Sequence, residues 1–367
     1  MTRDVILLTP GPLTTRPETR RAMLRDWGSR DAAFIALTAE MRERLLAVCH
    51  GRDSHVAVPL QGSGTFIVEA AITSLVPRNG KLLVLVNGSY GERMVDIARR
   101  LGRDVEALRW PENRPVEPDK VEQALASDAA ITHVALVHCE TTAGLLNPLK
   151  PVAEAVARQG RTLLLDAMSS FGALEIDLAT TPIAAVLASS NKCLEGVPGL
   201  GFAIVEHSVI AGAKGVSSSL SLDLHDQWRG LESNGQWRFT PPVQVVAALV
   251  ETLRALEQEG GPTARLRRYQ DNFDALAVGM RRLGFRLFLD EAVQAPIIAT
   301  FHPLEGRAFD FERFYAALAA RGFVIYPGKL TRAESFRVGC IGALDRRDFE
   351  RLLTAIEAVL EEDLQSA

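Results

Sequence analysis

The stretch VLASSNKCLEGVPGLGFAIVE, residues 186–206, decides the fold. An apolar run ends in two serines, Lys192 follows, and a loop with three glycines and one proline leads into a second apolar run. Both runs have the length and composition of buried strands. A lysine at the end of such a strand is either a loop residue that faces water or an amine held in a pocket for chemistry.

Similar apolar runs recur along the chain, and helical patterns separate them. Residues 81–87, 132–140, 161–170 and 184–190 are strand-like, and amphipathic helical patterns follow the first two. Continuous apolar strands that alternate with helices predict an α/β protein with a mainly parallel sheet and helices on both faces. In such sheets ligands bind outside the carboxyl ends of the strands, so the polar residues there are the candidates for function.

The C-terminal part has a different order of elements. An arginine-rich helical stretch, residues 262–285, has a charge pattern that suits a solvent-facing helix linking two domains. A strand–helix–strand–strand–helix order follows, which predicts a small α+β domain. We therefore predict a segment near the active site at 1–15, a large domain at 16–264 and a small domain at 265–367.

Composition excludes several classes of protein. The chain has 367 residues and a net charge of −4, which gives no reason to expect nucleic acid or an anionic membrane as a partner. Its apolar runs are shorter than the roughly 20 residues of a membrane span. The apolar run near its N-terminus is too short for the core of a signal peptide. Four scattered cysteines show no metal-ligand spacing, which favours reduced thiols and a cytoplasmic protein. Cys193 has no histidine near it in sequence that could activate it as a nucleophile.

Residues Ser63, Gly64 and Thr65 lead into a helical pattern. Backbone N–H groups at a helix N-terminus, together with the helix dipole, bind phosphate well. The ordinary alternative is a serine or threonine that caps the helix. This motif alone therefore indicates a phosphate site only weakly.

Asp166 and Lys192 come at the ends of consecutive predicted strands. A buried lysine loses its proton more readily and can bond to an aldehyde, while a carboxylate can keep a pyridine nitrogen protonated. With a phosphate cup, these two groups describe a pyridoxal 5′-phosphate site. A capping aspartate and a solvated lysine explain each residue singly, but not the combination.

Two further residues fit such a site. Tyr90 could stack on the pyridine ring, or it could be a half-buried helix residue. Arg337 lies between apolar neighbours on a predicted strand and therefore needs a counter-charge. A substrate carboxylate could supply that charge, and so could an internal Asp or Glu.

A series of motifs carries a resemblance to a known family. In chain order they are LLTPGPLTT, QGSGTF, NGSYGER, HCETTAGLLNPL, LLLDAMSSFGALEID, SSNKCLEGVPGLGF, WRFTPP and FRVGCIG. Over nearly its whole length the chain resembles class V (alanine–glyoxylate-like) aminotransferases. The resemblance implies fold type I of the pyridoxal-phosphate enzymes and a homodimer with its active sites at the subunit interface. Within the class, the motifs are most similar to those of members that use 2-aminoethylphosphonate and pyruvate.

The resemblance also implies roles for individual residues. Lys192 would be the catalytic lysine that bonds to the cofactor, and Arg337 would bind substrate. Thr240 of the partner subunit would help to bind the cofactor. The cofactor-binding residues of the same chain would be Ser63, Gly64, Thr65, Tyr90, Thr142, Asp166 and Asn191. Asp166 would face the pyridine nitrogen and Thr142 the phenolic oxygen, while Asn191 and Thr240 would add phosphate contacts.

Several alternatives stay open. Serine– or alanine–glyoxylate transamination keeps the fold and changes the substrate. A pyridoxal-phosphate lyase acting on a related amino-phosphonate would release ammonia without pyruvate. An α/β binding protein without cofactor leaves the ordered motifs unexplained. Arg30 could meet a phosphonate or pair with Asp26 or Asp31 at the surface.

Overall fold

Alternate side chains of the central strands enter two separate hydrophobic cores. In strand β3 (Lys81–Val86), Leu83 and Leu85 pack into one core, whereas Leu82, Val84 and Val86 pack into the other. Successive strand residues point to opposite faces, so helices must cover both sides of this sheet. Apolar residues of the helices on one side of the sheet complete the first core, and those of the helices on the other side complete the second.

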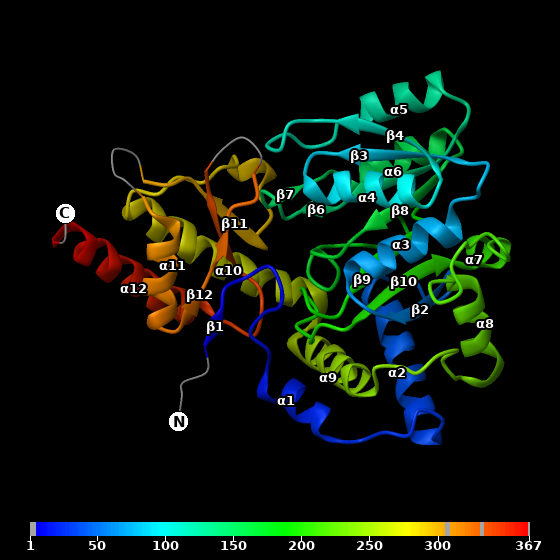
Figure 1. The fold of residues 1–367 in the computed structure, drawn as a ribbon, viewed down its shortest axis with the longest axis horizontal. Coiled ribbons are helices and arrows are strands. Elements are labelled where there is room, and N and C mark those ends of the chain that lie inside the picture. Colours follow the sequence, from blue (N-terminus) through cyan, green and yellow to red (C-terminus); the bar gives the residue numbers. More distant parts are fainter. Residues whose placement is uncertain (1–4, 305–308, 331–333, 366–367) are drawn as a thin grey trace.

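The computed structural model describes residues 5–304, 309–330 and 334–365, and Figure 1 shows how they are arranged. The central sheet has seven strands in the order β2-β10-β9-β8-β5-β3-β4. Only β10 runs antiparallel to its neighbours in this sheet. The strands are β2 (His55–Gln61), β3, β4 (Asp104–Arg109), β5 (Ile131–Val137), β8 (Thr162–Asp166), β9 (Ala185–Ser189) and β10 (Leu200–Glu206).

The predicted parallel sheet with helices on both faces is therefore confirmed, and its strand ends meet at one edge. The helices of this part are α1 (Pro17–Arg21), α2 (Ala32–Val48), α3 (Gly64–Leu75), α4 (Ser89–Arg100), α5 (Pro118–Ser127), α6 (Leu149–Arg158), α7 (His207–Gly212), α8 (Leu224–Asn234) and α9 (Val243–Glu259), with a 3-10 turn at Ala22–Leu24. A short hairpin, β6 (Cys139–Glu140) and β7 (Leu145–Leu146), extends beyond β5.

The C-terminal part packs around a three-stranded sheet with its own core. Its elements are α10 (Gly261–Arg282), a 3-10 turn at Glu291–Val293, β11 (Ile298–Phe301), α11 (Phe311–Ala320), β12 (Phe323–Val324), β13 (Tyr326–Pro327), β14 (Phe336–Gly339) and α12 (Arg346–Gln365). The predicted order of strands and helices is confirmed, except that the strand predicted after α11 is divided into β12 and β13. The N-terminal strand β1 (Ile6–Leu7) pairs with β12, so this segment packs with the small sheet.

Helix α10 differs from the prediction in one respect. It begins at Gly261 and crosses the predicted domain boundary, and it does not simply face solvent. Arg265, Tyr269 and Asn272 are fully buried in it. Burial is tolerated because Arg265 pairs with Glu259 at 2.7 Å, so its charge is compensated. The division at 264/265 stays a prediction.

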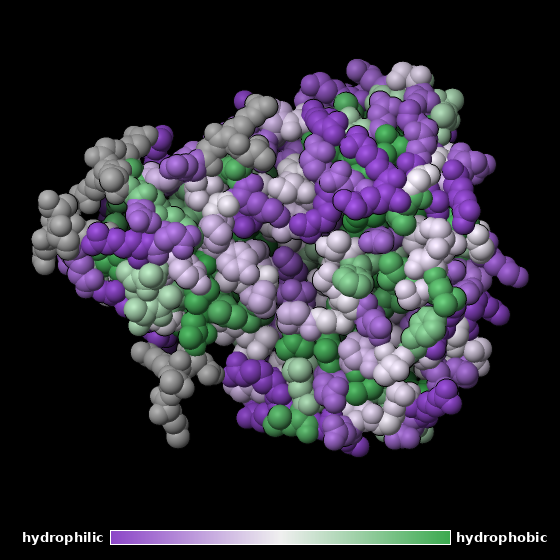
Figure 2. Space-filling model, in the orientation of Figure 1, coloured by the Kyte–Doolittle hydropathy of each residue, from purple (hydrophilic) through white to green (hydrophobic). Residues whose placement is uncertain are grey.

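The surface and the helices carry two further observations. Figure 2 shows hydrophilic and hydrophobic residues mixed on the face drawn, with hydrophilic ones prominent over the region of α4, β4 and α5. In the part of the chain that the structure describes, no helix is both long and apolar enough to cross a membrane.

Candidate active site

A cavity of about 190 Å³ opens at the carboxyl edge of the central sheet. Strands β5, β8 and β9 end there, as the sequence predicted. The predicted site residues that line it are Ser63, Gly64, Thr65, Tyr90, Asp166, Asn191 and Lys192. The fold therefore brings together a helix N-terminus, an aromatic ring, a carboxylate and an amine that lie far apart in sequence.

The first turn of α3 forms one wall of this cavity. Ser63 is the N-cap residue, and its side chain makes no capping hydrogen bond. The hydroxyl and the first backbone N–H groups of the helix are thus available to an anion. Arg93, which sequence reasoning missed, also lines the cavity and donates to Thr65 Oγ1 at 3.2 Å. Its guanidinium adds positive charge beside the predicted phosphate cup.

Asp166 ends strand β8 at the bottom of the cavity. Its Oδ1 accepts a hydrogen bond from the backbone N–H of Met168 at 2.9 Å, and no described residue donates to Oδ2. Burial and the nearby Glu140 raise the pKa of Asp166 to about 6. A buried carboxylate with one oxygen free is suited to a protonated ring nitrogen, which would stabilise its charge.

Lys192 follows strand β9, and its amine interacts electrostatically with Tyr90 and Asp166. Burial lowers the pKa of its amine below the ordinary value, although the neighbouring Tyr90, Cys193 and Asp166 oppose the shift. The N-terminal segment packs on this lysine. A Cβ atom at Gly11 would come within 2.9 Å of Lys192 Cδ and 2.8 Å of the Asn191 carbonyl oxygen, so only glycine fits there.

Tyr90 lies at the start of α4, where two cations approach its ring. Lys329 Nζ is 4.3 Å and Arg93 Cζ is 4.9 Å from the ring centroid. Burial raises the pKa of the Tyr90 hydroxyl, but the charges of Lys192 and Lys329 outweigh burial and lower it overall. Tyr90 thus borders the cavity, and its stacking on a cofactor ring stays a prediction.

Thr142 lies beside the cavity without being among the described residues that line it; its neighbour Thr141 does line it. The Thr142 hydroxyl donates to Glu140 Oε1 at 2.5 Å and accepts from the Ser89 N–H at 3.0 Å. The hydroxyl proton and one of its two lone pairs are therefore occupied, and its predicted contact with the cofactor stays a prediction.

Glu140 is a second residue to which the sequence motifs assigned no role. It is fully buried, and burial raises its pKa. Its Oε2 accepts hydrogen bonds from the backbone of Tyr90 at 3.1 Å and Gly91 at 3.4 Å, which fixes the start of α4. Its place at the end of a predicted strand was the available signal.

Arg337 is buried in β14, near the cavity but not among its described lining residues. Its guanidinium donates to the carbonyl oxygens of Pro327 at 3.0 Å and Thr141 at 2.9 Å. Within the described ranges no Asp or Glu forms an ion pair with it, although the charge of the buried Glu140 partly opposes the effect of burial on its pKa. Burial lowers its pKa, which leaves a desolvated cation that an anionic ligand would stabilise.

Thr240 and Arg30 lie outside the cavity. Both are exposed in this chain. Arg30 makes no ion pair with Asp26 or Asp31 in the residues that the structure covers, so neither alternative for it is supported. A role for Thr240 in a partner's site stays a prediction.

The cysteines behave as the sequence indicated. All four are free and buried. Burial raises the pKa of Cys193 to about 12, and its Sγ donates to the Ser169 carbonyl oxygen at 3.3 Å. Cys193 is thus a poor nucleophile.

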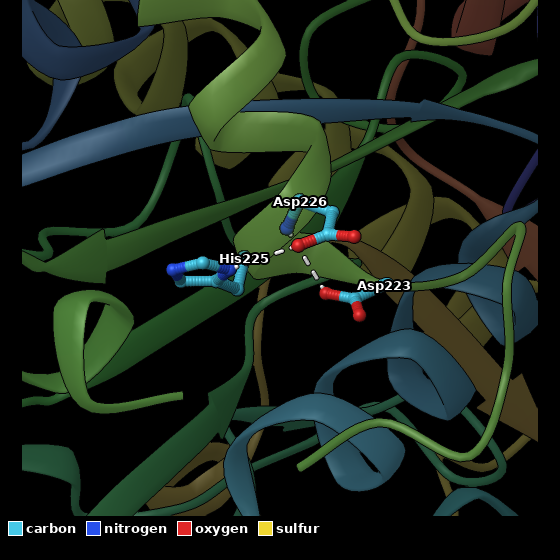
Figure 3. A group of neighbouring side chains, drawn as sticks. All are labelled: Asp223, His225 and Asp226. Atoms are coloured by element: carbon cyan, nitrogen blue, oxygen red, sulfur yellow. Dashed lines mark hydrogen bonds and ion pairs between the residues drawn. The ribbon is translucent and has the colours of Figure 1, made fainter. Parts of the chain in front are cut away.

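A group of Asp223, His225 and Asp226 has the composition of a metal site (Figure 3). Asp223 caps helix α8 by accepting from the Asp226 N–H at 3.0 Å, and His225 Nδ1 lies 3.1 Å from Asp226 Oδ1. Arg238 Nη2 is 3.4 Å from the other Asp226 oxygen. Helix capping and ion pairing account for this group without a metal.

The chain is similar to known proteins over nearly its full length. The family model of class V aminotransferases matches residues 19–326. The 2-aminoethylphosphonate–pyruvate transaminase 2 of Burkholderia lata is 56% identical over 97% of this chain and 94% of its own length. The corresponding transaminase of Pseudomonas fluorescens is 54% identical over 98% of this chain and 97% of its own.

Solved structures agree with this family. The crystal structure of an alanine–glyoxylate aminotransferase from Nostoc sp. has a TM-score of 0.91 and 27% identity, covering 98% of this chain and 96% of its own. The architecture is that of the fold type I pyridoxal-phosphate enzymes, which confirms the fold class predicted from the motifs.

Proposed function

The chain belongs to the class V aminotransferase family, and we propose on that basis that it moves the amino group of 2-aminoethylphosphonate to pyruvate. The products are phosphonoacetaldehyde and L-alanine, because the amine of the donor and the keto oxygen of pyruvate change places. The observation that carries this proposal is the full-length identity of 56% and 54% to two relatives bearing that name. The reaction would serve the breakdown of phosphonates.

The residues of the cavity fit pyridoxal 5′-phosphate, the cofactor of this enzyme. The uncapped first turn of α3 would bind its phosphate. The free oxygen of Asp166 would pair with its ring nitrogen, and Lys192 would bond to its aldehyde carbon. When bound, the cofactor supplies an electron sink for the charge that develops next to the substrate nitrogen.

Lys192 is the group that moves protons in this proposal. Burial favours its neutral amine. This amine could take a proton from the substrate carbon that bears the nitrogen and deliver it to the aldehyde carbon of the cofactor. Asp166 supports the reaction by keeping the ring nitrogen protonated. The two substrates use the same site in turn, so the kinetics should be ping-pong.

Arg337 is proposed to hold the anionic end of both substrates. Its guanidinium is desolvated, and in the described chain it donates hydrogen bonds only to carbonyl oxygens. It can therefore still form an ion pair with a phosphonate or a carboxylate. A planar guanidinium binds either group through two parallel hydrogen bonds.

We also propose a homodimer in the cytoplasm. Phe66, Leu220 and Phe239 are exposed apolar residues around one groove, and Phe239 adjoins Thr240. Packing of this surface on a second copy would bury it and bring Thr240 to the partner's cavity. The free buried cysteines support a reducing compartment.

The half-reaction tests the substrate. We expect 2-aminoethylphosphonate alone, without keto acid, to remove the visible absorbance band of the lysine-bound cofactor as the cofactor takes up the amino group, and pyruvate to restore that band. L-serine and L-alanine serve as parallel donors. If only the amino acids remove this band, the substrate assignment would change to serine– or alanine–glyoxylate transamination, and the role of Lys192 would stay the same. Continuous release of ammonia without pyruvate would identify a lyase.

A further inference from the structure

We propose that Glu195, Tyr269, Arg265, Arg268 and Glu259, here called the lysine clamp, position Lys192 and tie it to the small sheet that carries Arg337. The proposal rests on the proposed function only in taking Lys192 as the reactive amine. None of the clamp residues lines the cavity among its described walls, so they act through the turn that bears the lysine.

The turn after Lys192 has an unusual backbone. The Glu195 N–H donates to the Lys192 carbonyl oxygen at 2.8 Å, which closes the turn. Glu195 has a φ of 62°, in the left-handed region that a non-glycine residue rarely adopts. Such strain costs about 1–3 kcal/mol and persists only where surrounding contacts hold it in place.

The contacts that hold this turn come from helix α10. Glu195 is 2% exposed, and its Oε1 accepts hydrogen bonds from the Tyr269 hydroxyl and Arg268 Nη2, both at 2.7 Å. Arg265 Nη1 donates to the carbonyl oxygen of Cys193 at 2.9 Å. Helix α10 thus fixes the side chain of Glu195 and the backbone of Cys193 through three of its residues.

The clamp also reaches the small sheet. Arg268 Nη1 donates to the carbonyl oxygens of Gly342 at 2.6 Å and Leu344 at 3.0 Å. Both lie on the chain that leaves β14, the strand of Arg337. One guanidinium therefore joins the Lys192 turn to the segment after β14, which fixes the two site residues relative to each other.

Glu259, at the end of α9, completes the ion cluster. Its carboxylate lies 2.7 Å from Arg265 Nη2 and 2.8 Å from Arg268 Nε. Replacement of buried ion pairs by apolar residues is often neutral or stabilising, so stability alone is a weak reason for such a cluster. Fixed geometry at a reactive lysine is a better reason, since small displacements of a catalytic group are costly.

The test uses Tyr269→Phe and Glu195→Gln, which remove a hydroxyl and a charge with little change in shape. In the cofactor-free full chain, the pH dependence of Lys192 acetylation by acetic anhydride is followed by peptide mass spectrometry. Exposed Lys214 is the internal reference. We expect the midpoint for wild-type Lys192 to lie below the ordinary range of a lysine, and to rise by about one pH unit in the variants as the loosened amine reaches water.

In the cofactor-loaded enzyme we expect kcat to fall about tenfold or more, while the KM for the amino donor changes by less than about threefold. Arg254→Met is the matched control, because it removes a bond of 2.7 Å to Glu40 in another arginine–glutamate cluster. It should move neither quantity.

An unchanged Lys192 midpoint and kcat in Tyr269→Phe would overturn the clamp, even if Glu195→Gln does not fold. Equal effects in Arg254→Met would also overturn it, since they would reflect general destabilisation. The acetylation midpoint needs no substrate, so a failed substrate assignment would leave this result readable.

Discussion

At the scale of single residues, Lys192 and Asp166 form a pair whose ionisation is shaped by burial. Burial lowers the pKa of the lysine and raises that of the aspartate to about 6. The sequence predicted this pair because both residues end buried strands. It could not predict Arg93 or the contacts of Glu140, because these depend on how α4 packs against α3 and the β6–β7 hairpin.

Lys192→Ala tests the role of the amine. We expect kcat to fall by at least about a thousandfold, because no other described base lies at the same place, while cofactor and 2-aminoethylphosphonate still bind. Steady-state kinetics and equilibrium binding measure the two effects. Lys214→Ala, at an exposed lysine, should behave as wild type. Turnover above a tenth of the wild-type value in Lys192→Ala would remove this lysine from the mechanism.

Asp166→Asn tests the raised pKa of the buried carboxyl in the cofactor-free protein. The folded pKa of about 6 lies above the unfolded value of about 4. The protonated carboxyl therefore stabilises the fold below pH ~4, and this stability is lost as the pH rises through ~6. Relative to Asp166→Asn, we expect the free energy of unfolding of wild type to fall by on the order of 3 kcal/mol over that range.

Chemical denaturation at several pH values measures this difference. A difference that rises with pH would mean that Asp166 is stabilised as the anion in the empty site.

At the scale of elements, the strand ends were predictable and the helix contacts were not. Because β3 is buried on both faces, its continuous apolar run was diagnostic. The order of elements in the C-terminal part was also correct, apart from the division of one strand into β12 and β13. The arginines of α10 suggested a solvent-facing helix because sequence alone does not reveal partners such as Glu195 and the Cys193 carbonyl. Burial of Arg265 follows from tertiary contacts that no local pattern encodes.

Gly11→Ala tests the packing of the N-terminal segment on the lysine. Gly11 has a φ of 131°, and a Cβ there would lie 2.8 Å from the Asn191 carbonyl oxygen. We expect a loss of about 1–3 kcal/mol in unfolding free energy, with slower modification of Lys192. Gly102→Ala is the control, since its φ is also positive but no atom lies within 4 Å of the added carbon. Equal effects of the two substitutions on Lys192 would show that Gly11 does not position it.

At the scale of the whole molecule, the cavity is lined by the large sheet and its helices, while the N-terminal segment and the small sheet lie beside it and supply none of its described lining residues. Lys192 and Asp166 come from the first, Gly11 from the second and Arg337 from the third. Sequence could anticipate this arrangement only through the family resemblance, because the pairing of β1 with β12 joins residues more than three hundred positions apart. The exposed position of Thr240 makes sense in the same frame if a second copy completes the site.

Phe66→Glu tests the proposed dimer. Phe66 is 52% exposed in the first turns of α3, close to the cavity, and a charge there should prevent burial against a second copy. We expect light scattering to give a dimer for wild type and a monomer with weakened cofactor binding for the variant. Val278→Glu, at a residue of α10 that is 66% exposed, should stay dimeric. A monomeric wild type would contradict the proposal that Thr240 acts in a partner's site.

In the proposed reaction, this chain transfers an amino group from 2-aminoethylphosphonate to pyruvate by means of Lys192. The most direct measurement follows isotopically labelled nitrogen from 2-aminoethylphosphonate by mass spectrometry, with pyruvate present. We expect the label to appear in L-alanine, with an equal amount of phosphonoacetaldehyde, and Lys192→Ala to transfer none. Label recovered as free ammonia, or alanine formed at the wild-type rate by Lys192→Ala, would contradict it.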